Sequence, residues 1–304
     1  RVIRALDPVA FRDAFIVWAR TLCKSTAGKL VSIDGKTVRG AFVGEDGHGA
    51  LHLINAWVSE NAMVLGQYAT DVKSNEITAI PELLKLLDLK GAVVSIDAMG
   101  CQKTIAATIR ERGADYVFGL KGNHPTLYRE VLDAFDDETC AKLATSAHTF
   151  HAAADKGHGR NEYRRIWVQY DVDWLTRSEQ WPNLRALLLV ESERTVRGHT
   201  SCERRAYITS VEASAARMFD LVRGHWHVEN KLHWVLDVTF GEDRTKIAKR
   251  NGAENLSLIR KIALNMLQGA PVRSKRTSIS AKRQLASWRL DHLLSVLTSG
   301  TTLD

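Results

Sequence analysis

Three acidic residues stand in settings that could bring their carboxylates together. Asp34 and Asp97 each end a β-branched run, and Glu229 lies inside a helix-like segment at 223–234. Two strand-end aspartates and a helix glutamate can converge on one point, because strand ends hold side chains in defined places. Carboxylates at one point repel one another and need a cation, and oxygen-only ligation suits Mg²⁺, with Mn²⁺ as a substitute. Two such ions per active site catalyse phosphodiester chemistry, so the pattern predicts a metal-dependent nuclease or polynucleotidyl transferase.

Each of these acids also has a purely structural interpretation. Asp34-Gly35, flanked by alternating apolar residues, is a strong signal for a type I′ hairpin turn. Asp97 stands at a strand-to-helix junction, where an aspartate often caps a helix N-terminus. Glu229 alone could be a solvated helix residue. The functional hypothesis therefore rests on the three acids together, in the order and settings that a two-metal site needs.

The segment around the glutamate also suggests a rival metal site. His225, Glu229 and His233 are spaced at i, i+4 and i+8, which would place them on one stripe of an α-helix. Such a stripe could bind zinc or iron, although it lacks the His-Glu-x-x-His order of the zinc hydrolases. Trp226 and Trp234, beside these residues, could belong to the core.

Polar loops follow two of the predicted strands. One runs from Thr70 to Glu76, where Ser74 or Asn75 could instead cap the next helix. The other is the segment 120–125. Loops at strand ends favour function over packing in α/β folds. With the basic residues near the three acids, these loops supply the candidate DNA contacts: Lys36, Arg39, Lys73, Lys121, Asn123, His124, His225, Arg244, Lys246, Lys249 and Arg250.

The positive charge of the chain is concentrated near its C-terminus. The stretch 244–289 holds twelve Lys or Arg and one acid, a charge of +11, so the rest of the chain carries −4 of the net +7. A phosphate backbone is the commonest reason for such a concentration. The alternative is a solubilising tail, but here the basic residues alternate with apolar ones at helical spacing.

The order of the predicted elements indicates an α/β fold. Three successive strands precede a helix, a strand, a second helix and a fifth strand, at about 30–33 (or as far as Val38), 51–58, 63–68, 76–89, 92–96, 102–112 and 116–120. This is the order of the ribonuclease-H-like fold, a mixed sheet flanked by helices, in which the first and fourth strands are neighbours and would place Asp34 against Asp97. A mainly β insertion at about 140–210 lies between the second and third catalytic acids, and helices return at 214–222, 226–236 and 256–267.

Three regions follow from this pattern. Residues 1–29 are expected to be the end of an N-terminal helical region, 30–268 the catalytic core, and 269–304 a basic C-terminal region. The chain begins with Arg1, so we expect that an N-terminal piece is missing. The four cysteines form no Cys-x-x-Cys pair, and neither an export signal nor a membrane-length apolar stretch is visible. The expected location is the bacterial cytoplasm, at the nucleoid, with reduced thiols.

The chain resembles the DDE transposases of bacterial insertion sequences, most closely the H-repeat-associated subgroup. The resemblance covers about 30–268 and is carried by the segments 33–40, 72–77, 94–99, 120–123, 224–234, 236–243 and 255–260. It implies Asp34, Asp97 and Glu229 as the catalytic triad. It also implies cleavage at transposon ends, transfer of the 3′-hydroxyl to target DNA, and a homodimer assembled on the inverted-repeat ends.

The chain departs from the pattern of the wider group of transposases with a β-insertion. That pattern places Arg four residues before the glutamate and Lys seven residues after it. Here these positions hold His225 and Leu236. Two alternatives therefore stay open: a DNA-binding remnant without catalysis, and a structure-selective DNA nuclease that uses the same carboxylate triad.

Overall fold

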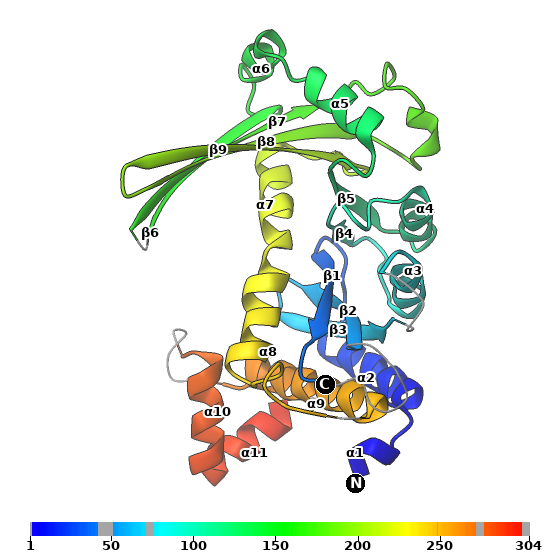
Figure 1. The fold of residues 1–304 in the computed structure, drawn as a ribbon, viewed down its shortest axis with the longest axis vertical. Coiled ribbons are helices and arrows are strands. Elements are labelled where there is room, and N and C mark those ends of the chain that lie inside the picture. Colours follow the sequence, from blue (N-terminus) through cyan, green and yellow to red (C-terminus); the bar gives the residue numbers. More distant parts are fainter. Residues whose placement is uncertain are drawn as a thin grey trace. The chain divides into compact units, whose positions relative to one another are not determined.

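The computed structural model describes residues 2–41, 51–70, 76–157, 159–247, 249–271 and 277–299 (Figure 1). Lys73 and the candidate helix caps Ser74 and Asn75 lie outside the described residues. The chain divides into two compact units. Unit 1 combines Arg1–Leu89 with Trp226–Asp304, and unit 2 is Lys90–His225. The division of the sequence at 29 and 268 stays a prediction.

The sheet of unit 1 is an antiparallel meander of β1 (Leu30–Val38), β2 (Leu51–Val58) and β3 (Met63–Ala69). Strand β1 does not turn at Asp34-Gly35, because Asp34 pairs with Asn55 and Gly35 with Ile54 of β2. The type I′ turn interpretation is therefore wrong, and Asp34 lies in the middle of a strand rather than at its end. The strand continues because its next alternate residues, Lys36 and Val38, are also buried.

Helices pack around this meander. They are α1 (Val2–Ala5), α2 (Pro8–Leu22), α3 (Glu76–Leu86), the short α8 (Trp234–Val238), and α9 (Arg250–Gly269). Helix α2 has a well-formed start: the Asp7 carboxylate accepts hydrogen bonds from the amides of Val9 and Ala10, and Pro8 occupies the first turn. Helices α2, α3 and α9 contact β3, and α9 also contacts β2. The meander is thus tied to helices from both ends of the sequence.

Helix α9 buries polar side chains as well as apolar ones. Asn265 accepts from the amide of Val64 at 2.9 Å and donates to its carbonyl at 2.8 Å, so the side chain satisfies the backbone of β3. Lys261 donates to Gln67 Oε1 at 2.6 Å and to Ser257 at 2.9 Å. Burial lowers the pKa of Lys261 to about 8. Helices α10 (Ile279–Trp288) and α11 (Leu290–Ser299) contact α9.

The sheet of unit 2 is mixed, in the order β4-β5-β9-β8-β7-β6. The strands are β4 (Val93–Ile96), β5 (Asp115–Leu120), β6 (Phe150–Gly157), β7 (Arg160–Gln169), β8 (Ala186–Val196) and β9 (His199–Thr209). Strands β4 and β5 are parallel, and every later pairing is antiparallel. Its helices are α4 (Lys103–Glu111), α5 (Pro125–Asp133), α6 (Asp137–Leu143), η1 (Ser178–Gln180) and α7 (Ala215–His225). Helix α7 contacts β4, β6 and β7.

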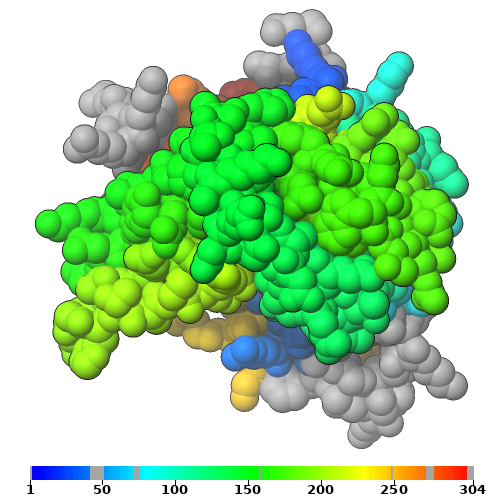
Figure 2. Space-filling view, turned by 90° about the horizontal axis from the view of Figure 1, so that it is seen from above, coloured from blue at the N-terminus to red at the C-terminus, as the bar shows by residue number. Residues whose placement is uncertain are grey.

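Strands β6 to β9 lie within 140–210, the stretch predicted to be mainly β. Arg197 and Gly198 both have positive φ (50° and 83°), the conformation of a tight hairpin turn, so β8 and β9 pair along their full length. The β8–β9 turn forms a protruding end of unit 2, at the lower left of Figure 2. None of the helices in the described ranges combines the length and apolar character that a membrane span requires.

Candidate active site

Asp34 is held on a rigid strand beside a histidine. Its side chain is 19% exposed, and its Oδ2 lies 3.4 Å from Nδ1 of His233. On the neighbouring strand β2, Asn55 is the direct partner of Asp34, and its Nδ2 lies 3.4 Å from Nε2 of the same histidine. His233 therefore contacts both members of a cross-strand pair.

Asn55 was not predicted as a site residue. It is fully buried in β2, and its Nδ2 donates to the carbonyl of Leu53 at 3.4 Å. Within the described residues its Oδ1 has no hydrogen-bond partner, although buried amide oxygens almost always have one. The signal available in the sequence was a lone amide side chain inside an otherwise apolar stretch of strand.

Lys36 lies two residues beyond Asp34, on the same face of β1. It is only 8% exposed, and its Nζ lies 2.7 Å from Asp237 and 3.3 Å from Asp243. The charge of Lys36 is therefore neutralised by carboxylates of the protein itself. The structure does not support the prediction that Lys36 contacts DNA. Arg39 is 83% exposed, with its Nε 3.7 Å from Asp243, and its DNA contact stays a prediction.

The opposite face of β1 is closed by a second histidine. His52 contacts Thr37 Oγ1 through Nδ1 at 3.0 Å and Glu76 through Nε2 at 2.6 Å. Both His52 and Glu76 occupy the space where a Cβ at Gly35 would lie. Glycine at position 35 therefore allows the His52–Glu76 pair to approach the backbone next to Asp34.

Glu229 lies in η2 (Val228–His233), a π-helical segment, and its side chain is exposed. Single π-helical turns occur often at functional sites. Among the described residues, no group of three His, Cys, Asp or Glu is arranged to hold a metal ion. The structure therefore does not support the rival metal site of His225, Glu229 and His233: His225 contacts Ser95, and His233 contacts Asp34. Trp226 and Trp234 are 38% and 57% exposed, so their interpretation as core residues is wrong.

Asp97 follows the last residue of β4 in unit 2. Its Oδ1 accepts hydrogen bonds from the amides of Met99 at 3.1 Å and Gly100 at 3.3 Å. Helix α4 begins only at Lys103, with Gln102 as its N-cap, so Asp97 is not the helix cap. It caps the preceding turn instead, and this orients one oxygen of the carboxylate.

Two residues predicted to contact phosphate hold the turn that follows Asp97. Asn123 donates to the carbonyl of Ala98 at 2.6 Å, and Nε2 of His124 lies 2.6 Å from the carbonyl of Cys101. Lys121, in the same loop, is exposed. The loop after β5 therefore holds the loop after β4 in place. Of the three residues of this loop that were predicted to contact DNA, Lys121 is the one that exposes a charge to solvent.

His225 ends α7 and contacts Ser95 of β4, with Nδ1 2.9 Å from the hydroxyl. Burial lowers the pKa of His225 to about 4, an effect that the nearby Asp97 charge partly opposes. The imidazole is therefore neutral at neutral pH and has no positive charge to offer a phosphate. The structure gives it a place in the packing of α7 on β4.

The basic C-terminal stretch is only partly a surface feature. Arg244, Lys246 and Lys249 are exposed, whereas Arg250 donates to the carbonyl of Thr70. Three further basic residues of this stretch are buried: Arg260, Lys261 and Lys282. Some of the charge concentration therefore serves packing within unit 1 rather than a partner.

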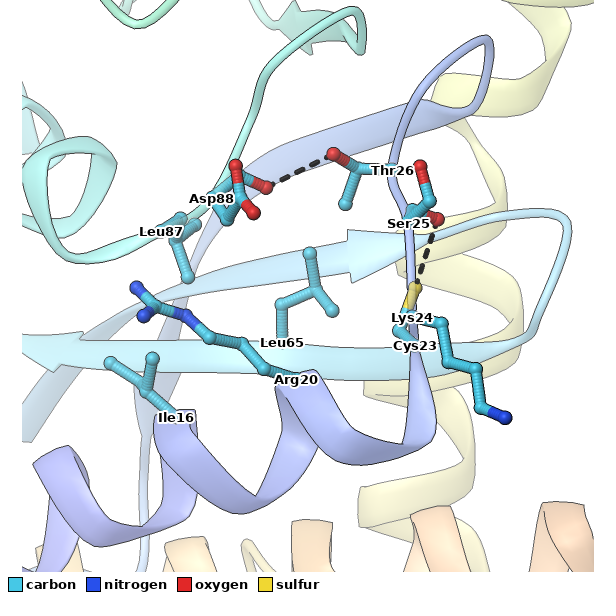
Figure 3. A pocket seen from close by; sticks show the side chains of 9 residues that line it. All are labelled: Ile16, Arg20, Cys23, Lys24, Ser25, Thr26, Leu65, Leu87 and Asp88. Atoms are coloured by element: carbon cyan, nitrogen blue, oxygen red, sulfur yellow. Dashed lines mark hydrogen bonds between the residues drawn. The ribbon is translucent and has the colours of Figure 1, made fainter. Parts of the chain in front are cut away.

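A small cavity of unit 1 lies apart from all of these residues. It has a volume of about 50 Å³ and lies between the end of α2 and the segment after α3 (Figure 3). Thr26 donates to the carbonyl of Asp88 across it, and burial raises the pKa of the Cys23 thiol in its wall. Ligand pockets are several times larger, so we assign no small-molecule site here.

The donor atoms suit a hard cation. Asp34 and Glu229 of unit 1 and Asp97 of unit 2 offer carboxylate oxygens, and Asn55 adds a buried amide oxygen without a partner among the described residues. Oxygen donors of this kind are those that Mg²⁺ and Mn²⁺ prefer. Over the described ranges, no group of three His, Cys, Asp or Glu has the arrangement of a complete metal site.

Comparisons with known proteins point to one family. The model of the transposase DDE domain matches residues 26–266. YbfL and the H repeat-associated candidate transposase YhhI, both of Escherichia coli strain K12, are each 39% identical over 98% of this chain and 79% of their own. YncI of Escherichia coli O157:H7, also named as a candidate transposase, is 37% identical over 100% of this chain and 77% of its own.

Among the solved structures that match is a cryo-EM synaptic complex of piggyBac transposase with hairpin DNA. The match is 11% identical with a TM-score of 0.39, and covers 91% of this chain and 53% of that one. This chain thus spans about half the length of the solved one. The similarity is too low to support a structural argument.

Proposed function

The chain belongs to the transposase DDE domain family, and on this premise we propose that it cleaves phosphodiester bonds at transposon ends and joins the freed 3′-hydroxyl to target DNA. Asp34, Asp97 and Glu229 are the proposed catalytic residues. The observation that supports this assignment best is that the structure fixes the position of both aspartates. Asp34 lies on a paired strand, with its carboxylate beside His233. The carboxylate of Asp97 accepts hydrogen bonds from the amides of Met99 and Gly100.

The order of strands supports a ribonuclease-H-like core. Unit 1 contains three consecutive antiparallel strands, and unit 2 begins with the parallel pair β4 and β5 joined through α4. A parallel pair requires a crossover of this kind. The four strands β6–β9 then follow as the proposed insertion, before the chain reaches Glu229.

The three carboxylates would hold divalent cations. When bound, two Mg²⁺ ions, or Mn²⁺ in their place, lower the pKa of the attacking water and stabilise the leaving oxygen. The protein's own contribution is orientation: His233 lies against one oxygen of Asp34, and two amides hold one oxygen of Asp97. Side chains fixed in this way need less rearrangement when substrate arrives.

Exposed basic residues would position the DNA. The proposed contacts are Arg39, Lys121, Arg244, Lys246 and Lys249, all of which are exposed. Contacts to phosphate fix register without reading sequence, and each one increases the salt dependence of binding. We propose that two copies of the chain assemble on a pair of inverted-repeat ends.

A cleavage assay tests this function. Labelled duplex DNA with the flanking inverted repeats is incubated with the full chain in Mg²⁺, Mn²⁺ or EDTA. We expect metal-dependent nicking at the repeat boundary. Asp97→Asn should reduce it by at least about 10²-fold while DNA binding, measured by fluorescence anisotropy, is retained. The control is Asp133→Asn, at the exposed end of α5, which should cleave like the wild type.

The other outcomes are equally informative. Equal cleavage by Asp97→Asn would disprove the triad. Salt-sensitive binding without nicking, in either metal, would identify a DNA-binding remnant. Cleavage of branched DNA without joining to a target would identify a structure-selective nuclease.

A further inference from the structure

His233 connects Asp34 to Asn55 through its two ring nitrogens. Nδ1 lies 3.4 Å from Oδ2 of Asp34, and Nε2 lies 3.4 Å from Nδ2 of Asn55. Because Asp34 and Asn55 are cross-strand partners, their side chains leave the same face of the sheet. The imidazole of the π-helical segment therefore lies over this pair.

The contact with Asn55 favours one tautomer of His233. An amide nitrogen can only donate, so its contact with Nε2 requires that Nε2 be unprotonated. The amide is oriented by a second contact, because the same Nδ2 donates to the carbonyl of Leu53. In a neutral imidazole the proton then resides on Nδ1, which faces the carboxylate of Asp34.

Both distances exceed the roughly 2.9 Å of an ordinary hydrogen bond. Catalytic hydrogen bonds often shorten when the substrate complex forms. Groups that orient a metal ligand in this way typically change metal affinity by about 10–100-fold. The contacts from Asn55 to His233 and from His233 to Asp34 join the residue types that commonly orient a metal ligand.

We propose that His233 is a positioning residue for Asp34. Its Nδ1–H holds one carboxylate oxygen, so that the other can bind a divalent cation, and Asn55 sets the tautomer that makes this possible. The inference rests on the proposed function in identifying Asp34 as a ligand. It goes beyond that function by assigning a role to two residues outside the triad.

Two substitutions separate the roles of the ring nitrogens. His233→Asn keeps an N–H donor near the position of Nδ1, whereas His233→Gln keeps one near Nε2. We measure Mn²⁺ binding to the full chain by electron paramagnetic resonance. His233→Gln should weaken Mn²⁺ binding roughly tenfold, while His233→Asn should stay within about threefold of the wild type. Equal affinities of the two variants would overturn the proposal.

The wild type provides a test that does not depend on how variants fold. In the ¹⁵N-histidine-labelled, metal-free protein, long-range ¹H–¹⁵N spectra should show His233 protonated on Nδ1 and unprotonated on Nε2. The His233 signal is assigned by its absence from the spectrum of His233→Asn. If His233→Asn does not fold, the signal is assigned by its shift in Asn55→Leu. A proton on Nε2 alone would overturn the proposal.

Failure of the proposed function would look different. If Asp34→Asn abolishes Mn²⁺ binding and His233→Gln weakens it, but the wild type cuts no DNA, the positioning role holds and the transposase chemistry fails. If the wild type cuts DNA and His233→Gln binds Mn²⁺ like the wild type, only the positioning role fails.

Discussion

The two aspartates of the proposed triad are held in opposite ways. Asp34 lies in the middle of a nine-residue strand, with the ion pairs of the buried Lys36 on its own face and His52 and Glu76 on the other. Asp97 lies just beyond a four-residue strand, in a turn held by hydrogen bonds from the next loop. One setting depends on burial of charge and close backbone packing, the other on a few polar contacts. We therefore expect substitutions of the packing and ion-pair residues around Asp34 to affect stability, and substitutions that loosen the turn of Asp97 to affect catalysis.

The largest contrast should come from two glycines. A Cβ at Gly40, just after β1, would overlap the backbone carbonyl of Thr245 and lie 3.1 Å from that of Asp243. Because backbone cannot move aside as a side-chain end can, Gly40→Ala should lower the free energy of unfolding by about 3 kcal/mol. A Cβ at Gly122, in the loop beside Asp97, would meet nothing within 4 Å.

Gly122→Ala should therefore change the free energy of unfolding by less than about 0.5 kcal/mol. Urea denaturation of the two variants measures the difference. Similar stabilities of Gly40→Ala and the wild type would show that the segment just after β1 is not closely packed. The expected difference between the surroundings of Asp34 and Asp97 would then be wrong for Asp34.

Two lysines, both predicted from the sequence to contact DNA, give the next contrast. Lys36→Met leaves Asp237 and Asp243 without their buried cation, which should cost about 3 kcal/mol of stability. Lys121→Met removes an exposed charge and should leave stability unchanged. If Lys121 contacts phosphate, the slope of log affinity against log salt should fall by about 1.

The measurements are chemical denaturation and DNA binding at several salt concentrations. A normal salt slope for Lys121→Met would remove it from the DNA interface. A stable Lys36→Met would show that its ion pairs are unimportant for the setting of Asp34.

Asn123→Ala should lower stability less than Gly40→Ala or Lys36→Met. It removes one hydrogen bond to the carbonyl of Ala98, worth about 1 kcal/mol. Because this bond holds the turn of Asp97, we expect the cleavage rate to fall about tenfold, the equivalent of about 1.4 kcal/mol in the barrier. Asn161→Ala, at an exposed position of β7, is the matched control in the same unit. A normal cleavage rate for Asn123→Ala would show that the brace does not act on catalysis.

Much of the fold could be predicted from local patterns. Strands β2, β4 and β5 and the helix α4 lie within about two residues of their predicted bounds, because alternating or continuous apolar runs bounded by turns specify them. The errors have local causes as well. Asp34-Gly35 has the composition of a turn, yet pairing with β2 overrides that preference. The π-helical segment gave no signal in the periodicity, because it is a single turn within a longer helical pattern.

The sequence by itself determined the family motifs, the order of the elements and the acids that the motifs contain. Only the tertiary structure decided what those residues touch. Lys36, Asn123 and His124 belong to conspicuous polar motifs, but the buried Lys36 pairs with Asp237 and Asp243, and Asn123 and His124 hold the loop of Asp97. His233 meets Asp34 across most of the length of the chain. The physical reason is that hydrogen bonds and ion pairs join groups that are close in space, and local sequence does not encode which distant segments packing will bring together.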